Sequence, residues 1–304
     1  FPMYYISAMH AHVLPAMLGG ASCVLVDTTS PREHVALLER YRVSWAYAVP
    51  SWWRLCLRVP QLSAASLPAL TRLAAGGAPF PSDLQAALRE RLPATRLFDV
   101  YGLSETHSPG CIATDDDLRE RPGSVGRPLP CMEAEIRDDD GTVLPPGVPG
   151  QLWMRGSLVT TGYANDPEAT AEAIVDGWFD TGDVARIDAD GFVFIVDRAK
   201  DMVIRGGENV YCAEVEAALF EHPAVTDVAV LGVPHKVLGE EVGAVVRLRP
   251  GASATAEELR AHVGERLAAF KVPAHVWFRE AELPRNPAGK VLKRDLRDEL
   301  VSEP

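Results

Sequence analysis

The sequence predicts an α/β protein in which part of a large α/β domain, with a parallel sheet and a β-rich subdomain, is followed by a smaller α+β domain. Three observations lead to this prediction. Over residues 13–100, short apolar runs alternate with helical patterns, which is typical of a parallel sheet with right-handed crossovers. After residues 115–117, proline and glycine turns separate short alternating runs, which favours a β-subdomain. Beyond residue 200, helices and strands share about 100 residues, enough for a separate domain.

In the first region the apolar runs are the expected strands and the segments between them the expected helices. The strands are residues 23–26, 43–49, 71–75 and 96–100, and the helices are residues 31–41, a segment through Trp52 and Trp53, and residues 81–91. In the β-subdomain we expect strands at residues 133–137, 151–155 and 192–196, the last being a β-rich run flanked by turn residues.

The third region opens with a helix from Ala213, in which Val215 and Leu219 share one face. Thr255 and Glu258 form a capping box for a later helix. The remaining elements are strands at residues 226–233 and 242–248, that helix at 256–269, a strand at 275–278 and a final helix at 293–300.

Composition excludes several classes of function. The chain has 304 residues, 47% apolar and 24% charged, which is enough for a substantial core. Its net charge of −12 argues against nucleic acid as the main partner, because phosphate binding needs a basic face. No run approaches the roughly 20 apolar residues that span a membrane, and no signal peptide is visible. The five cysteines are scattered without a CxxC pair, so we expect neither disulfides nor zinc, and a reducing cytoplasm.

Two loops follow neighbouring strands of the predicted parallel sheet, where such sheets bind ligands. The first holds Gly76, Gly77 and Ala78, and the second runs from Tyr101 and Gly102 through Ser104 and Glu105. Tyr101 can stack on a purine, and Asp99 just before it can accept from an exocyclic amino group. The Ser104 hydroxyl can bond a phosphate oxygen, and the Glu105 carboxylate can bind Mg²⁺. Taken alone, this stretch is a weak signal, because most tyrosine–glycine pairs are turns and most serine–glutamate pairs are helix starts.

A second polar cluster precedes the third region. Asp183 and Arg198 are expected at the ends of elements, where a carboxylate and a guanidinium can hold two vicinal hydroxyls of a ribose. Gly206 and Gly207 permit close approach of a ligand to the backbone. The residues leave open that Asp183 and Arg198 form an ordinary surface ion pair and that the glycines only make a turn.

One lysine near the end of the chain stands in a loop rich in proline and glycine. This is Lys290, in residues 283–290, where a cation could neutralise charge that develops on a carboxylate or phosphate in a transition state. The alternative is a solvated surface lysine. Lys293, three residues later, is expected to be solvated.

Four motifs then occur in order: YGLSE, WFDTGD about 75 residues later, DRAKDMVIRGGENVYCAEVE, and PRNPAGK. In this order and spacing they resemble the acyl-adenylate-forming (AMP-binding) superfamily, which includes acyl-CoA synthetases and peptide-synthetase adenylation domains. The resemblance covers essentially the whole chain. It implies a large domain of which residues 1–199 are the C-terminal part, and a small mobile domain at residues 200–304.

The resemblance also implies roles for individual residues. Gly76, Gly77 and Ala78 match the loop beside adenine and the acyl carboxylate, Tyr101 the adenine-stacking aromatic, Ser104 the phosphate-contacting hydroxyl and Glu105 the magnesium ligand. Asp183 and Arg198 match the pair that binds the ribose hydroxyls, and Lys200 matches the hinge between the domains. Gly206 and Gly207 match the loop that lines the pantetheine tunnel. Lys290 matches the catalytic lysine.

The implied activity is an ATP-dependent acid:CoA ligase that uses ATP, Mg²⁺ and coenzyme A. In such an enzyme a carboxylic or fatty acid attacks the α-phosphate of ATP with loss of pyrophosphate, and the thiol of CoA then displaces AMP. The small domain rotates between the two half-reactions, and Lys290 serves the first. The alternatives are an adenylation domain acting with a carrier protein and a non-catalytic nucleotide-binding paralogue.

The sequence departs from the family pattern in two places. The family's phosphate loop would lie upstream of Phe1, so we expect a longer protein and a fragment that alone lacks full activity. Tyr4 and Tyr5 stand where the family often has a histidine near the acyl pocket. The acid is therefore not predicted, although Trp52, Trp53, residues 76–79 and His107 are candidates for lining its pocket.

Overall fold

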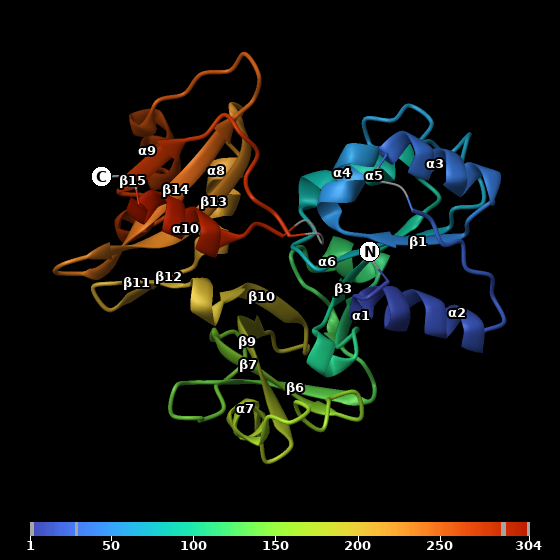
Figure 1. The fold of residues 1–304 in the computed structure, drawn as a ribbon, viewed down its shortest axis with the longest axis horizontal. Coiled ribbons are helices and arrows are strands. Elements are labelled where there is room, and N and C mark those ends of the chain that lie inside the picture. Colours follow the sequence, from blue (N-terminus) through green and yellow to red (C-terminus); the bar gives the residue numbers. More distant parts are fainter. Residues whose placement is uncertain (1–2, 28–29, 287–289, 303–304) are drawn as a thin grey trace. The chain divides into compact units, whose positions relative to one another are not determined.

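The computed structural model of the protein describes residues 3–27, 30–286 and 290–302. The chain divides into two compact units (Figure 1). Unit 1 comprises Phe1–Thr181 with Ala185–Ile195, and unit 2 comprises Gly182–Val184 with Val196–Pro304.

The first sheet of unit 1 confirms the predicted parallel α/β arrangement. Its strand order is β1 (Trp45–Ala48), β2 (Arg72–Gly76), β3 (Arg96–Tyr101), β4 (Cys111–Ala113) and β5 (Arg127–Pro128). The strands β1, β2 and β3 are parallel, with Ala48 beside Ala75 and Ala75 beside Asp99, whereas β4 and β5 are antiparallel. The register brings the carboxyl ends of β2 and β3 together.

Alternation along the strands divides the apolar residues of unit 1 between two faces of this sheet. Ala46 and Ala48 face the core beneath α3 (Pro31–Arg40), α4 (Pro50–Cys56) and α5 (Ser82–Arg91), whereas Tyr47 belongs to a second cluster with Ala11. Figure 1 shows α3, α4 and α5 on one side of β1 and the N-terminal helices on the other. These are α1 (Ile6–Ala8), a π-helical turn (Met9–Val13) and α2 (Leu14–Leu18).

The prediction of a strand at residues 23–26 is wrong. These residues have no regular secondary structure, and Val24, Leu25 and Val26 are 40%, 66% and 46% exposed. A strand requires a partner for its backbone N–H and C=O groups, and none of the strands in the described part of the chain pairs with this segment.

The second sheet is the predicted β-subdomain. It runs in the order β10 (Val193–Arg198), β9 (Trp178–Ile187), β7 (Gly150–Gly156) and β6 (Met132–Arg137), with β8 (Ile174–Val175) beside β9. In the sequence, α6 (Asp115–Glu120) precedes the strands of this sheet, and α7 (Pro167–Ala173) lies between β7 and β8. The long strand β9 was not predicted, and it places Asp183 inside a strand rather than at the end of an element, which corrects that expectation. Its polar Asp180, Thr181 and Asp183 hide the alternation that would have marked it as a strand.

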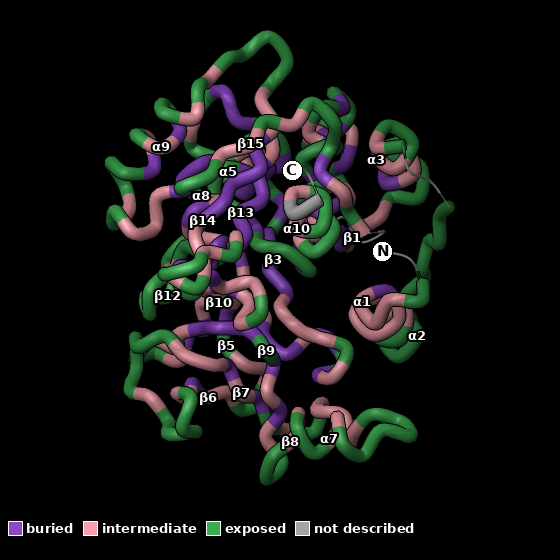
Figure 2. The backbone as a smooth tube through the Cα atoms, turned by 60° about the vertical axis from the view of Figure 1, so that its left-hand side comes forward, coloured by how far each residue is buried: buried purple, intermediate pink, exposed green. Residues whose placement is uncertain are grey.

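Unit 2 is built on a third sheet. Its order is β12 (Glu208–Val210), β11 (Val203–Arg205), β14 (Gly239–Leu248) and β13 (Val225–His235), and β15 (His275–Phe278) is parallel to β14. Figure 2 shows β13 and β14 as largely buried. Helices α8 (Cys212–Phe220) and α9 (Ala256–Gly264) cover the face that carries Val228 and Val230, and α10 (Lys293–Ser302) covers the face that carries Ala229 and Leu231.

The predicted start of α9 is confirmed, but its predicted end is wrong. The capping box is confirmed, because the Glu258 N–H donates to Thr255 Oγ1 at 3.1 Å and the Thr255 N–H donates to Glu258 Oε2 at 2.8 Å. The helix ends at Gly264 rather than residue 269, and a separate 3₁₀ turn covers Ala269–Lys271. Across the described residues of both units, no helix is long and apolar enough to cross a membrane.

Candidate functional site

The loop after β2 is shaped by close packing against its neighbours. A Cβ atom on Gly76 would lie 2.4 Å from the Val100 carbonyl oxygen and 2.5 Å from the Tyr47 hydroxyl, so only glycine fits there. Gly77 has a φ of +77°, which favours glycine, and Ala78 is exposed. The exposed turn therefore leaves the sheet edge directly beside the end of β3.

The end of β3 places Asp99 and Tyr101 on the same face of the strand. Tyr101 is half-buried against the core of the second sheet, and Asp99 is buried. Burial raises the pKa of Asp99 to about 7, so near neutral pH both its acid and its carboxylate are present. Gly102 follows in a tight passage, because a Cβ there would lie 3.0 Å from the Gly110 nitrogen.

Beyond this passage a 3₁₀ turn, Ser104–Thr106, presents the two expected polar side chains. Ser104 is exposed, and Glu105 is half-buried. The Tyr163 hydroxyl donates to Glu105 Oε1 at 2.9 Å, and the Thr160 N–H donates to the Glu105 carbonyl at 2.7 Å. Sequence analysis missed Tyr163, because no local pattern connects residues 58 positions apart.

This end of unit 1 suits Mg²⁺ held through a nucleotide. Mg²⁺ keeps much of its shell as water and phosphate oxygens and needs only one or two carboxylates from the protein. Glu105 offers one such carboxylate, whose Oε1 accepts from the Tyr163 hydroxyl at 2.9 Å. The donor set therefore fits the metal that the sequence predicted.

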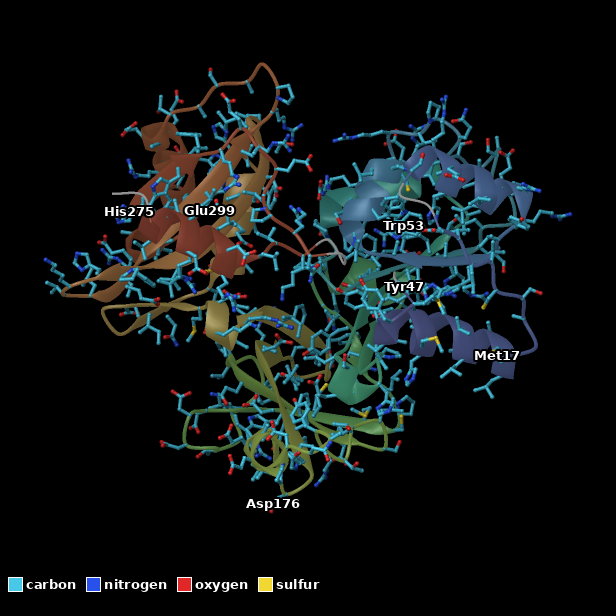
Figure 3. All side chains as sticks on the ribbon, in the orientation of Figure 1. Met17, Tyr47, Trp53, Asp176, His275 and Glu299 are labelled. Carbon is cyan, nitrogen blue, oxygen red and sulfur yellow. The ribbon has the colours of Figure 1, made fainter. Side chains whose placement is uncertain are left out.

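Two candidates for the acyl pocket prove to differ in environment. Trp53 is fully buried beneath α3, α4 and α5 and donates to the Ala74 carbonyl at 2.9 Å, so it is a core residue. Figure 3 shows Trp53 and Tyr47 on opposite sides of β1. His107 is exposed, with its ring stacked on that of His10 at 5.2 Å between centroids.

In unit 2, Asp183 and Arg198 form the expected pair. Arg198 Nε lies 3.2 Å from Asp183 Oδ1, and Arg198 closes β10 beside β9. The Asp183 side chain is only 5% exposed and that of Arg198 is 37% exposed. The carboxylate is therefore much more buried than that of an ordinary surface ion pair, and the guanidinium is partly open to solvent.

Lys290 is held by a clamped loop. Its N–H donates to Asn286 Oδ1 at 2.9 Å, and the Asn286 N–H donates to the Lys290 carbonyl at 2.9 Å. Arg285 anchors the other arm through two hydrogen bonds to Asp227 at 2.7 and 2.8 Å. Residues 287–289 of the predicted loop lie outside the described residues.

The structure brings Lys290 near the Asp183–Arg198 pair. The pKa of Lys290 is lowered by desolvation and then by the positive charge of Arg198. The charge of Lys200 acts in the same direction, whereas the carboxylates of Asp201 and Asp183 raise the pKa. The lowered pKa is typical of a lysine held among other cations rather than of a freely solvated one.

The remaining candidates of unit 2 lie on its turns. Lys200 is exposed in the middle of a 3₁₀ turn, Ala199–Asp201, directly after β10. Gly206 and Gly207 connect β11 to β12 with φ values of +60° and +89°. The Gly206 N–H donates to the Leu238 carbonyl at 2.8 Å, so this turn lies beside the one that joins β13 to β14.

Lys293 is not the solvated lysine that the sequence suggested. Its Nζ lies 2.8 Å from Glu216 Oε1, and the two side chains are 16% and 21% exposed. Desolvation acts to lower the pKa of Lys293, but the charge of Glu216, its hydrogen bond and the other neighbouring acidic groups together outweigh desolvation, and the pKa is raised. The first residue of α10 is thereby tied to α8.

Comparison with known proteins gives family matches in both units. The model of the AMP-binding enzyme family matches residues 1–164, and the model of the AMP-binding enzyme C-terminal domain matches residues 214–290. A feruloyl-CoA synthase from an Amycolatopsis species is 37% identical over 97% of this chain and 60% of its own length. A long-chain-fatty-acid–CoA ligase from Yersinia pestis is 39% identical over 99% of this chain and 53% of its own length.

Solved structures agree in fold. The o-succinylbenzoate CoA synthetase of Bacillus subtilis, in complex with ATP and magnesium, superposes with a TM-score of 0.87 at 32% identity, covering 98% of this chain and 60% of that chain. An amide bond synthetase from Marinactinospora thermotolerans superposes with a TM-score of 0.84 at 40% identity, covering 91% of this chain and 57% of that chain. The chain thus spans between about half and three-fifths of the length of these relatives.

Proposed function

Because this chain belongs to the AMP-binding enzyme family, we propose that the protein carrying it is an ATP-dependent acid:CoA ligase. The observation that carries the proposal is that Lys290, whose backbone is bonded to Asn286, lies near enough to the Asp183–Arg198 pair for both charges to act on its pKa. Relatives named as a feruloyl-CoA synthase and a long-chain-fatty-acid–CoA ligase, matched along nearly the whole of this chain, support the same reaction class.

In the first half-reaction a carboxylate oxygen of the acid attacks the α-phosphorus of ATP, and pyrophosphate leaves. Tyr101 stacks on the adenine, with Asp99 at its edge and the turn of residues 76–78 beside it. Asp183 accepts hydrogen bonds from the ribose hydroxyls, and Arg198 donates to them. Lys290 stabilises the negative charge that develops on the oxygens around the α-phosphorus.

The metal and the phosphates meet at the other polar loop. Ser104 donates to a phosphate oxygen, and Glu105 is the carboxylate that would hold Mg²⁺. When bound, Mg²⁺ neutralises phosphate charge and so favours departure of pyrophosphate.

In the second half-reaction the thiol sulfur of CoA attacks the acyl carbonyl, the bond to AMP breaks, and AMP leaves with the electron pair. Gly206 and Gly207 carry no side chain, so their turn lets the pantetheine arm run close to the backbone.

A second candidate differs only in the acceptor. The similarity to an amide bond synthetase, at 40% identity, favours an enzyme that forms the same acyl-adenylate but transfers the acyl group to an amine. The two candidates share the first half-reaction and separate at the second.

The test is a screen of the complete gene product over short, medium, long-chain and aromatic acids. We expect acid-dependent exchange between ATP and pyrophosphate with at least one class of acid, and release of an acyl-CoA thioester when CoA is added. Amide formation with simple amines, without thioester, would favour the second candidate. ATP binding without exchange for any acid would leave only a nucleotide-binding protein.

We expect Lys200→Pro in the complete protein to retain adenylate formation and to lose most thioester formation. The proposed small domain, residues 200–304, must turn between the half-reactions, and proline fixes the φ angle at the proposed hinge. The matched control is Lys200→Ala, which removes the same side chain and leaves the backbone free. Single-turnover rates of both half-reactions decide the matter, and equal losses in the two would show that the hinge lies elsewhere.

A further inference from the structure

Glu105 is held by a residue from a distant loop. The Tyr163 hydroxyl donates to Glu105 Oε1 at 2.9 Å, and in the described residues Glu105 Oε2 has no hydrogen-bond partner. The loop is fixed at two further points. The Thr160 N–H donates to the Glu105 carbonyl at 2.7 Å, and the Tyr163 N–H donates to Thr170 Oγ1 at 2.9 Å near the start of α7.

The hydroxyl of Tyr163 is not explained by packing. The residue is 39% exposed and belongs to none of the buried core clusters in the described part of the chain. Its hydroxyl is instead directed to the Glu105 carboxylate. A phenylalanine would keep the ring and lose only this contact.

We propose that Tyr163 is a positioning residue for the Mg²⁺ ligand Glu105, an inference that rests on the proposed function. By binding Oε1, Tyr163 restricts the rotation of the carboxylate and leaves Oε2 for the metal. A free glutamate would lose this side-chain freedom when the metal binds, which weakens binding. Side chains that orient metal ligands typically contribute 10–100-fold to metal affinity. Because this site is half-exposed, we expect the lower end of that range.

The experiment measures binding rather than turnover. The affinity of the complete protein for ATP is measured by calorimetry at increasing Mg²⁺ concentration, for wild type and for Tyr163→Phe. We expect the Mg²⁺ concentration that gives half of the increase in ATP affinity to rise about tenfold in Tyr163→Phe. ATP affinity without Mg²⁺ and the melting temperature should stay near wild type.

Two further variants separate positioning from a general effect. Tyr41→Phe removes an exposed phenol elsewhere in unit 1, at the end of α3, and should leave the Mg²⁺ midpoint unchanged. In a Glu105→Ala background, which has no side-chain oxygen for the Tyr163 hydroxyl, Tyr163→Phe should have no additional effect, because Tyr163 acts through the carboxylate.

The inference is overturned if Tyr163→Phe leaves the Mg²⁺ midpoint in place, or shifts it equally in the Glu105→Ala background. If the inference fails in this way while the wild-type protein still binds ATP with Mg²⁺ and forms acyl-adenylate, the proposed function is retained and only the role of Tyr163 is overturned. A wild-type protein that binds no ATP, with or without Mg²⁺, would overturn both.

Discussion

Lys290→Ala should slow acyl-adenylate formation by about 10²–10³-fold while thioester formation from supplied acyl-adenylate stays near wild type. Negative charge builds on the oxygens around the α-phosphorus as the acid attacks, so a cation there stabilises the transition state more than the ground state. The clamp between Asn286 and Lys290 holds the backbone of this lysine in place, which reduces the cost of positioning its cation.

The pH dependence of the two half-reactions should differ as well. Lys290 acts as a cation, and its pKa is lowered, so adenylation should decline with rising pH sooner than an ordinary lysine would cause. The lysine is fully charged below this lowered pKa and loses its proton as the pH passes through it. Lys290→Ala should remove that decline from the adenylation rate, and the thioester half-reaction should lack it in wild type.

The control is Lys236→Ala. Lys236 is an exposed lysine in the same unit, on the turn between β13 and β14, and carries the same charge. Single-turnover measurements of both half-reactions on both variants test the assignment. Normal adenylation in Lys290→Ala, or an equal selective loss in Lys236→Ala, would show that the catalytic cation is another residue.

Lys293→Met should lower the free energy of unfolding by about 3 kcal/mol, because it leaves the Glu216 carboxylate buried without its cation. We take the low end of the range for broken buried pairs, since both side chains keep some exposure to solvent, which screens their interaction. Denaturant unfolding of the complete protein, followed by circular dichroism, measures the change.

A double variant distinguishes a lost ion pair from lost packing. Glu216 Oε1 also accepts from the Val230 N–H at 2.8 Å, so Glu216→Gln keeps an oxygen for that donor and removes the charge. Lys293→Met with Glu216→Gln should recover most of the loss. Lys236→Met, on an exposed lysine, should change the free energy of unfolding by less than about 0.5 kcal/mol. No recovery in the double variant would mean that the methylene stem of Lys293, not its charge, stabilises α10.

Elements that repeat a local pattern were predictable. The strands β2 and β3 are short apolar runs between helices, and the start of α9 is marked by Thr255 and Glu258 within four residues. The loops that follow β2 and β3 were predicted from the same order of elements. Their partners were not, because the contact between Tyr163 and Glu105 joins positions 58 residues apart.

The residue types and the order of the motifs were enough to predict the family, the parallel sheet and which polar residues belong to the candidate site. Folding decided their environments. Asp183 is a buried strand residue, Lys293 is half of a shielded ion pair, and residues 23–26 form no strand. The reason is physical: periodicity and capping depend on neighbours within a few positions, whereas desolvation, ion pairing and strand pairing depend on which distant segments the folded chain brings into contact.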